Sequence, residues 1–336
     1  MFKTPVVLFT FKRKEPLLRI IDRLSIVKPT KLYLISDAGR NADEHILVKD
    51  VRESIENCID WNCEIIKNYA HTNKGVYKSI GEGAKWVLEK EESAIFLEDD
   101  NLPEITFFNF CSEMLEKYKN DDSVMWVVGT NYLEKYLPRD GASYMFTKHM
   151  LPCGWASWGN KFSKFYDGEL KLLNKKSRKE LKEKFINKKL YKQEVTKYFK
   201  TKHTLEKSIK LASWDAQMGF SIRHNDFYGI SPKYNQIENI GVDEFSTHGG
   251  TSYVDNSPAA EMISRFCGIK TIPLEFPLKH PKNIEIDLEY EKKIAEIVLY
   301  PFLERFKISL MTFVKPLLGI NKYASFKTIL KKQNLH

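Results

Sequence analysis

The chain has 336 residues, 43% of them hydrophobic, which is enough apolar material for one large α/β domain or two smaller ones. Its net charge of +9 is concentrated: residues 161–210 carry seventeen Lys/Arg against six Asp/Glu, and residues 301–336 carry seven against one. Basic residues gathered in one insertion and one tail argue against a nucleic-acid groove and favour an anionic membrane surface or a phosphorylated lipid.

The cysteines and the N-terminus indicate the compartment. The five cysteines have no metal-ligand spacing, and their odd number favours reduced thiols in the cytoplasm. The N-terminal apolar run is too short for a signal peptide or a membrane span, and no cleavable small-residue site follows it. We therefore expect the chain to begin with the first strand of a cytoplasmic domain.

The first hundred residues alternate short apolar runs with amphipathic stretches. The run at 6–9 predicts a buried strand, the runs at 31–35 and 63–66 predict two further strands, and helices are predicted after Pro16 and over 43–58. This strand–helix–strand spacing predicts right-handed parallel units. Neither GxGxxG nor GxxxxGK[ST] occurs, which disfavours a dinucleotide dehydrogenase and a P-loop enzyme.

Polar residues follow these predicted strands, where open α/β sheets bind ligands. The first strand ends in Thr10, Phe11 and Arg13. Asp37 follows the second strand, where an acid hydrogen-bonds a base or ribose or simply forms a turn. Lys74 lies in a polar loop before a predicted helix, a position that brings backbone amides and a lysine against phosphate.

The acidic triplet Glu98-Asp99-Asp100 directly follows the apolar run 94–97. Three carboxylates at the end of a buried strand repel one another, so burying them is costly unless a cation balances them. Carboxylate oxygens are the ligands of Mg²⁺ or Mn²⁺ bound together with substrate phosphates. The alternative is an acidic turn that caps the helix beginning near Pro103.

The second half of the chain adds aromatic and charged features. After a predicted strand at 124–128, Trp155 and Trp158 offer either an apolar face to a sugar ring or a pair of core side chains. Residues from about 165 to 210 alternate charge with apolar positions at helical spacing, which predicts a basic helical insertion or a solvated helix face.

Three features complete the chain. Asp215 lies in a helical pattern that ends at His224, where a single acid is ordinarily a surface charge. His248 lies in a glycine-rich loop, and an imidazole there is either a ligand suited to Mn²⁺ or a residue without a role. From Leu299 to Leu317 apolar residues recur at spacings of three and four among basic ones, which predicts an amphipathic helix that lies on a membrane or docks on the catalytic domain.

The order of these features resembles that of GT-A type glycosyltransferases over roughly residues 4–255. The triplet is similar to their metal-binding DXD motif. The matching landmarks are Gly75-Val76-Tyr77-Lys78, Glu98-Asp99-Asp100, Cys153-Gly154-Trp155, Trp214-Asp215 and Ser246-Thr247-His248-Gly249. They resemble the Golgi N-acetylglucosaminyltransferases that act on the core mannose of N-glycans, and more closely bacterial sugar transferases of surface polysaccharide. The chain departs from the Golgi enzymes in lacking an N-terminal membrane anchor and in carrying the basic insertion and tail.

The resemblance implies roles for individual residues. Asp100 would ligate a divalent cation, Mn²⁺ or Mg²⁺, with His248 beside the metal or the diphosphate. Glu98 and Asp99 would contact the ribose and the waters of the metal, and Asp37 would contact the uracil or ribose. Asp215 would be the base of a single displacement with inversion. The other residues to which we assign donor binding are Thr10, Phe11, Arg13, Lys74, Gly154 and Trp155.

We therefore expect an α/β fold of the GT-A type, with a Rossmann-like, mixed but mostly parallel sheet flanked by helices. Residues 1–290 would form the catalytic domain, with a nucleotide-sugar-binding half at 1–130 and an acceptor half at 131–290. Residues 291–336 would form a basic amphipathic tail.

The expected activity is a metal-dependent, inverting transfer of a hexosyl or N-acetylhexosaminyl group from a nucleotide-sugar, first of all a UDP-sugar. The acceptor would be a hydroxyl of a glycan or lipid-linked oligosaccharide in bacterial surface-polysaccharide synthesis, at the inner face of the cell membrane, with no nucleic-acid partner. The alternatives are a sugar-1-phosphate nucleotidyltransferase, which would want a glycine-rich phosphate loop after the first strand, and a non-catalytic nucleotide-sugar-binding membrane scaffold.

Overall fold

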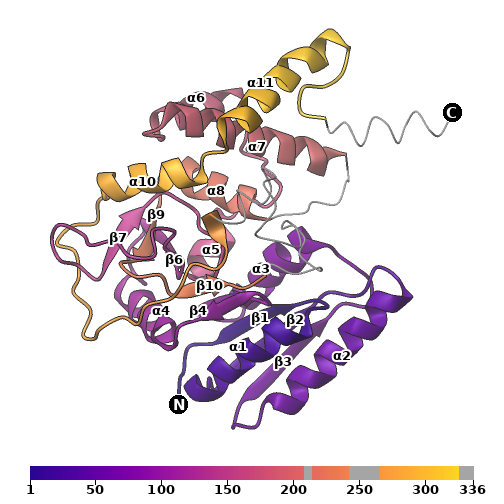
Figure 1. Ribbon diagram of the computed structural model, residues 1–336, viewed down its shortest axis with the longest axis vertical. Helices are drawn as coiled ribbons and strands as arrows, with labels where there is room; N and C mark the ends of the chain where they lie inside the picture. Colours follow the sequence, from indigo (N-terminus) through magenta and orange to yellow (C-terminus); the bar gives the residue numbers. More distant parts are fainter. Residues whose placement is uncertain (208–213, 242–264, 325–336) are drawn as a thin grey trace.

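The computed structural model describes residues 1–207, 214–241 and 265–324. An eight-stranded sheet in the order β3-β2-β1-β4-β8-β6-β9-β7 forms its centre (Figure 1). The strands β7 and β8 run antiparallel to their neighbours, and the other six run parallel to one another. The expected α/β class, with a mixed and mostly parallel sheet flanked by helices, is therefore confirmed.

The N-terminal half is built from parallel strand–helix units. Its elements are β1 (Val6–Thr10), α1 (Lys14–Val27), β2 (Lys31–Ser36), α2 (Ala42–Cys58), β3 (Glu64–Tyr69), η1 (Lys78–Glu82), α3 (Gly83–Leu88), β4 (Ser93–Glu98), β5 (Asn101–Pro103) and α4 (Ile105–Lys117). The predicted helix after the polar loop is present, but its first turn, η1, is a π-helix, which no pattern in the sequence indicates.

The second half contributes the antiparallel strands and the insertion. Its elements are β6 (Val124–Val128), β7 (Tyr144–Thr147), β8 (Trp155–Trp158), α5 (Gly159–Phe165), α6 (Lys175–Glu183), α7 (Lys188–Glu206), α8 (Asp215–His224), β9 (Tyr228–Pro232), β10 (Ile237–Asn239), α10 (Leu288–Val298) and α11 (Phe302–Leu317). The predicted basic helical insertion corresponds to α6 and α7. The strand β10 pairs with β5 in a separate two-stranded sheet.

The two faces of the sheet bury separate apolar clusters because side chains alternate along a strand. In β1, Val6 and Leu8 pack with α1, α2 and α4, whereas Val7 and Phe9 pack with α3, α8 and α10. A third cluster joins α6, α7 and α8. The continuous apolar runs of the sequence thus become strands that are covered on both faces.

The C-terminal helices differ in burial. The expected tail boundary at residue 291 falls inside α10, where Tyr290, Glu291, Ile294 and Ala295 are buried. None of the residues of α11 is buried. The well-packed part of the chain therefore extends through α10. Within the residues that the structure describes, no helix is long and apolar enough to cross a membrane.

Candidate functional site

The acidic triplet lies at the carboxyl end of β4, beside the end of β1. Glu98 is the last residue of β4 and is paired in register with Phe9. Asn101 begins β5, and its side chain donates to Asp100 Oδ1 (2.6 Å) and accepts from the backbone N–H of Gly154 (2.8 Å). This buried asparagine fixes the direction in which the chain leaves the triplet. The acids lie at the edge of the sheet where the sequence places them.

Arg13, in the turn after β1, is bound to two of the three acids. Its guanidinium donates from Nε to Asp99 Oδ1 (3.1 Å), and from Nη2 to the same carboxylate and to Asp100 Oδ2 (2.9 Å). Nη1 donates to the backbone carbonyl of Gly241 (3.4 Å). A Cβ atom on Gly241 would lie 2.3 Å from Asp100 Oδ2, which is too close. The glycine lets the backbone close over the pair.

One guanidinium does not balance three acids. Burial, followed by Asp100 and Asp99, raises the pKa of Glu98 to about 8. Burial raises the pKa of Asp99 to about 6, although Arg13 lowers it. The triplet therefore has fewer positive partners than carboxylates, and a cation would be stabilised there.

The donor set fits a divalent cation only if a ligand brings further oxygens. Among residues 1–207, 214–241 and 265–324, no three His, Cys, Asp or Glu side chains are grouped to hold a metal. Asp100 supplies a single carboxylate, and His248 lies outside the described residues. Mg²⁺ and Mn²⁺ are commonly held by one or two carboxylates together with phosphate oxygens.

Asp215 comes close to the triplet through its neighbour. The Trp214 side chain hydrogen-bonds the Glu98 carboxylate, and its ring lies 5.3 Å from that of Trp155. Asp215 follows as the first residue of α8 and forms an ion pair with Lys197 of α7. Although burial lowers the pKa of Lys197, Asp215 and Glu194 hold it above its ordinary value. No pattern in the sequence distinguishes Lys197, because it is one of many lysines in the insertion.

Asp37 organises the polar loop after β3. Its Oδ1 accepts from the backbone N–H groups of Ala38 and Lys74 (both 2.8 Å), and its Oδ2 from Gly75 (2.9 Å) and from the Asn73 side chain (3.0 Å). Gly75 has a φ of 82°, which a residue with a Cβ rarely adopts. The sequence allows Asp37 either to hydrogen-bond a base or ribose or to form a turn, and these contacts match the turn.

Other predicted donor residues lie around this edge. Thr10 ends β1, and its backbone carbonyl accepts from the backbone N–H of Asp37 (3.2 Å), while its buried hydroxyl has no partner among the described residues. Phe11 is half-buried, and the guanidinium carbon of Arg40 lies 5.7 Å from the centre of the Phe11 ring. Lys74 lines a cavity of about 200 Å³ together with Lys78, Ser79, Glu82 and Trp86 of η1 and α3 and with the ends of β2 and β3.

Gly154 and Trp155 lie beneath the site. Gly154 has a φ of 60°, and a Cβ there would lie 2.4 Å from the Ile237 side chain. Trp155 is fully buried, with its ring 3.9 Å from Phe96 and 4.3 Å from Trp126. Direct contact between Trp155 and a sugar is therefore wrong for this structure, and the core interpretation of the tryptophans holds. Both residues support the site from below.

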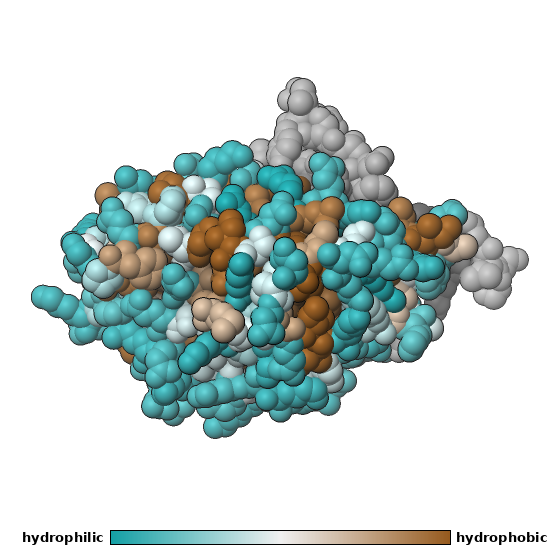
Figure 2. Space-filling view, turned by 90° about the horizontal axis from the view of Figure 1, so that it is seen from below, coloured by the Kyte–Doolittle hydropathy of each residue, from teal (hydrophilic) through white to brown (hydrophobic). Residues whose placement is uncertain are grey.

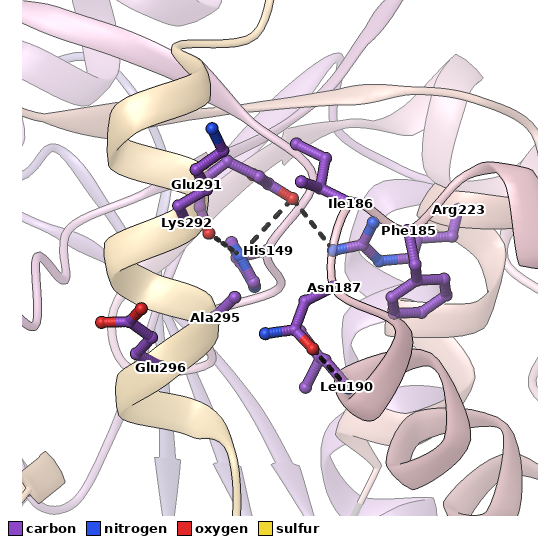
Figure 3. Close-up of a pocket in the computed structure, with 10 residues that line it drawn as sticks. All are labelled: His149, Phe185, Ile186, Asn187, Leu190, Arg223, Glu291, Lys292, Ala295 and Glu296. Atoms are coloured by element: carbon purple, nitrogen blue, oxygen red, sulfur yellow. Dashed lines mark hydrogen bonds and ion pairs between the residues drawn. The ribbon is translucent and has the colours of Figure 1, made fainter.

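A second buried charge cluster fixes α10 and is separate from the triplet (Figure 3). Glu291 accepts from Arg223 (3.1 Å), from the hydroxyl of Thr147 (2.6 Å) and from the backbone N–H of Lys148 (3.0 Å). His149 Nε2 lies 2.9 Å from the Glu291 carbonyl oxygen. The side chains of Glu291, Arg223 and His149 line a cavity of about 270 Å³ between α10 and the ends of α7 and α8. The cluster holds α10 against the sheet.

No family model and no curated protein matches the chain. A UDP-glucose pyrophosphorylase in complex with UDP-glucose is 10% identical, covering 70% of this chain and 92% of its own, with a TM-score of 0.35.

Two further solved structures show a similar degree of likeness. The 4-diphosphocytidyl-2C-methyl-D-erythritol synthase of Anaerococcus prevotii is 13% identical over 67% of this chain and 99% of its own, with a TM-score of 0.33. HddC from Yersinia pseudotuberculosis is 9% identical over 49% and 80%, with a TM-score of 0.30. Likeness at these TM-scores carries no argument about what this chain does.

Proposed function

We propose that the chain is a metal-dependent, inverting glycosyltransferase of the GT-A type that uses a nucleotide-sugar, first of all a UDP-sugar. The observation that carries the proposal is the link from the acidic triplet at the end of β4, through the Trp214–Glu98 hydrogen bond, to Asp215 at the start of α8. Cation-binding acids and a separate carboxylate side by side are what a sugar transfer from a diphosphate needs.

The donor side is assigned to the edge formed by β1, β2 and β4. When bound, a Mn²⁺ or Mg²⁺ ion held by Asp100, with His248 as a second ligand, would neutralise the charge that develops on the leaving nucleoside diphosphate. Arg13 keeps Asp99 and Asp100 together, so the carboxylates face the site in a fixed arrangement. Glu98 and Asp99 are assigned to the ribose and to the waters of the ion.

The loop held by Asp37 is assigned to the nucleotide. Both oxygens of Asp37 are bonded to this loop. We therefore assign Asp37 an indirect role in donor binding: it holds the loop and does not contact the base. We also assign Lys74, which lines the cavity beside η1, and Thr10, whose hydroxyl has no partner among the described residues, to donor binding.

Asp215 is assigned as the general base. Its carboxylate takes the proton of the acceptor hydroxyl while that oxygen attacks the anomeric carbon, in one displacement that inverts the configuration. The buried Trp214 side chain, which precedes Asp215 in the chain, bonds the Glu98 carboxylate. Lys197 holds the Asp215 carboxylate in one orientation through the ion pair.

The acceptor is assigned as a hydroxyl of a glycan or of a lipid-linked saccharide in surface-polysaccharide synthesis. The basic insertion and tail favour an acceptor held at an anionic surface, so we place the enzyme at the cytoplasmic face of the cell membrane. Residues 1–130 would then bind the donor, and the following part of the chain would bind the acceptor.

A thermal-shift panel of UDP-, GDP- and dTDP-sugars, each with and without Mn²⁺, tests the proposal. A ligand at about 100 times its dissociation constant stabilises the fold by about 2.7 kcal/mol. We expect a shift with at least one nucleotide-sugar that requires the cation and is lost in Asp100→Ala. The control Asp50→Ala removes an exposed acid of α2 and should keep the shift. No shift with any nucleotide, or the same shift in Asp100→Ala, would contradict the proposal.

A further inference from the structure

The C-terminal helix α11 presents an apolar face that no described residue covers. Six large side chains are between 47% and 74% exposed: Phe302, Leu303, Phe306, Leu310, Phe313 and Leu317. At about 3.6 residues per turn, these positions fall within an arc of about 100°. We call this face the α11 stripe.

The opposite side of the helix rests on the protein. Glu304, Arg305, Thr312 and Lys315 are half-buried. Burial and the neighbouring Lys200 of α7 lower the pKa of Lys315, and the ring of Tyr323, after the helix, lies 5.3 Å from that of Phe199 of α7. The polar side thus faces α7 and the stripe faces outward, so docking of the stripe on the catalytic domain is not what the structure shows.

Basic residues lie at the same end of the molecule as the stripe. The helices α6, α7 and α11 lie together at one end of the molecule (Figure 1). Exposed lysines of α6 and α7 include Lys179, Lys182, Lys189 and Lys192. The view from the other end shows a mainly hydrophilic surface with separate apolar patches (Figure 2). The basic residues of α6, α7 and α11 are therefore gathered at the end that carries the stripe.

The exposed apolar stripe and the basic residues at the same end favour one partner for this face, an anionic membrane. A second copy of the chain would bring two basic surfaces together, and like charges across an interface oppose association. An anionic bilayer offers acyl chains to the Phe and Leu side chains and headgroup charges to the surrounding lysines. With 16 residues, α11 suits the plane of the interface rather than a span.

We propose that α11 inserts its stripe into the headgroup region of an anionic membrane and that the lysines of α6 and α7 contact the same surface. The inference goes beyond the proposed reaction and would stand without it. Its orientation places α7, which carries Lys197, between the membrane and α8.

Co-sedimentation with lipid vesicles tests the inference without any assay of activity. The full chain should bind vesicles of phosphatidylcholine with phosphatidylglycerol more strongly than vesicles of phosphatidylcholine alone, and more weakly as salt is raised. The variant Phe306→Gln/Phe313→Gln should lose at least about tenfold in affinity, because each phenylalanine contributes apolar area to the bilayer. Glutamine keeps a good helix propensity.

The control variant is Ile308→Gln, on the same helix but off the stripe, which should bind as the unchanged protein does. Equal binding by the stripe variant, or binding to neutral vesicles alone with no dependence on salt, would overturn the inference. So would a dimer in light scattering that the stripe variant converts to a monomer, since the stripe would then be covered by a second copy.

Discussion

Lys197 of the basic insertion forms an ion pair with Asp215 at the start of α8. The pair joins the insertion to the residue that we assign as the base. From the sequence alone, the charge of the insertion indicates only a solvated or membrane-facing surface. The side chains of Lys197 and Asp215 are 31% and 25% exposed. The insertion therefore contributes to the site itself.

Asp215→Asn should lower kcat by about 10²–10⁴-fold and leave the affinity for the donor nearly unchanged, since a positioned general base contributes about that factor. The measurement is steady-state kinetics at saturating acceptor. If Asp215 only hydrogen-bonds the acceptor, the variant would instead raise the acceptor KM and keep kcat within a fewfold of the unchanged protein.

Lys197 is a positioning residue in this account. Lys197→Met should lower kcat by about tenfold or more, because Asp215 loses the partner that orients its carboxylate. Lys197→Arg, which keeps the charge, should recover much of the loss. Lys192→Met, a change of an exposed lysine on the same helix, is the control. Equal defects in the Met and Arg variants, with unchanged kcat/KM for the donor, would point to packing alone.

Asp100→Ala should abolish the activity, with or without added Mn²⁺ or Mg²⁺, and should leave the fold intact. Removing one acid relieves repulsion within the triplet, and Arg13 still pairs with Asp99. Circular dichroism and the melting temperature check the fold, and turnover with added cation or excess EDTA checks the site. Full turnover in EDTA would contradict the metal assignment.

Asp37→Asn should destabilise the protein by about 1–3 kcal/mol, because an amide cannot accept from all four N–H groups that the carboxylate binds. The donor KM should rise more than kcat falls, since the loop at 73–75 is assigned to the nucleotide. Urea unfolding and donor titration measure the two effects. An unchanged donor KM in a destabilised variant would leave Asp37 with a structural role only.

Glu291→Gln should destabilise the protein by about 3–5 kcal/mol at neutral pH, because it leaves buried Arg223 without its counter-charge. Burial alone would raise the pKa of Glu291, but His149 and Arg223 lower it from 4.5 to about 2. Its contribution, corresponding to about 3 kcal/mol, is present above the unfolded-state pKa and is lost as pH falls through the folded-state value.

The difference in stability between Glu291→Gln and the unchanged protein should therefore shrink between about pH 5 and pH 2. Denaturant unfolding over this range measures it. Glu289→Gln, on the same helix but exposed, should change stability by less than about 0.5 kcal/mol at any pH. A difference that stays constant with pH would show that the destabilisation comes from packing and not from the charge of Glu291.

The elements that the sequence predicts well are those with local patterns. The bounds predicted for β6 match the structure, since it is an apolar run with turn residues at both ends. The strand β8 was not predicted, because Trp155–Trp158 stands next to Gly154 and Gly159 and resembles a loop. What makes it a strand is its pairing with β4 and β6, which is a long-range contact.

The same distinction applies to the site. The triplet at a strand end follows from an apolar run and three adjacent acids. The bonds of Arg13 to Asp99 and Asp100 join residues 86 and 87 positions apart, and no local pattern encodes them. The contacts of Asp37 also depend on where the loop after β3 returns. The sequence therefore identifies which acids lie at the edge, and the fold determines which protein groups they bind.

The most direct measurement is the product formed from a nucleotide-sugar panel with Mn²⁺ and a lipid-linked or glycan acceptor, followed by phosphorus and proton NMR. The account predicts release of a nucleoside diphosphate, a glycoside with the anomeric configuration inverted, and loss of both in Asp100→Ala and Asp215→Asn. Formation of a nucleoside triphosphate and a sugar 1-phosphate when pyrophosphate is added, with no transfer to any acceptor, would contradict it and establish a nucleotidyltransferase.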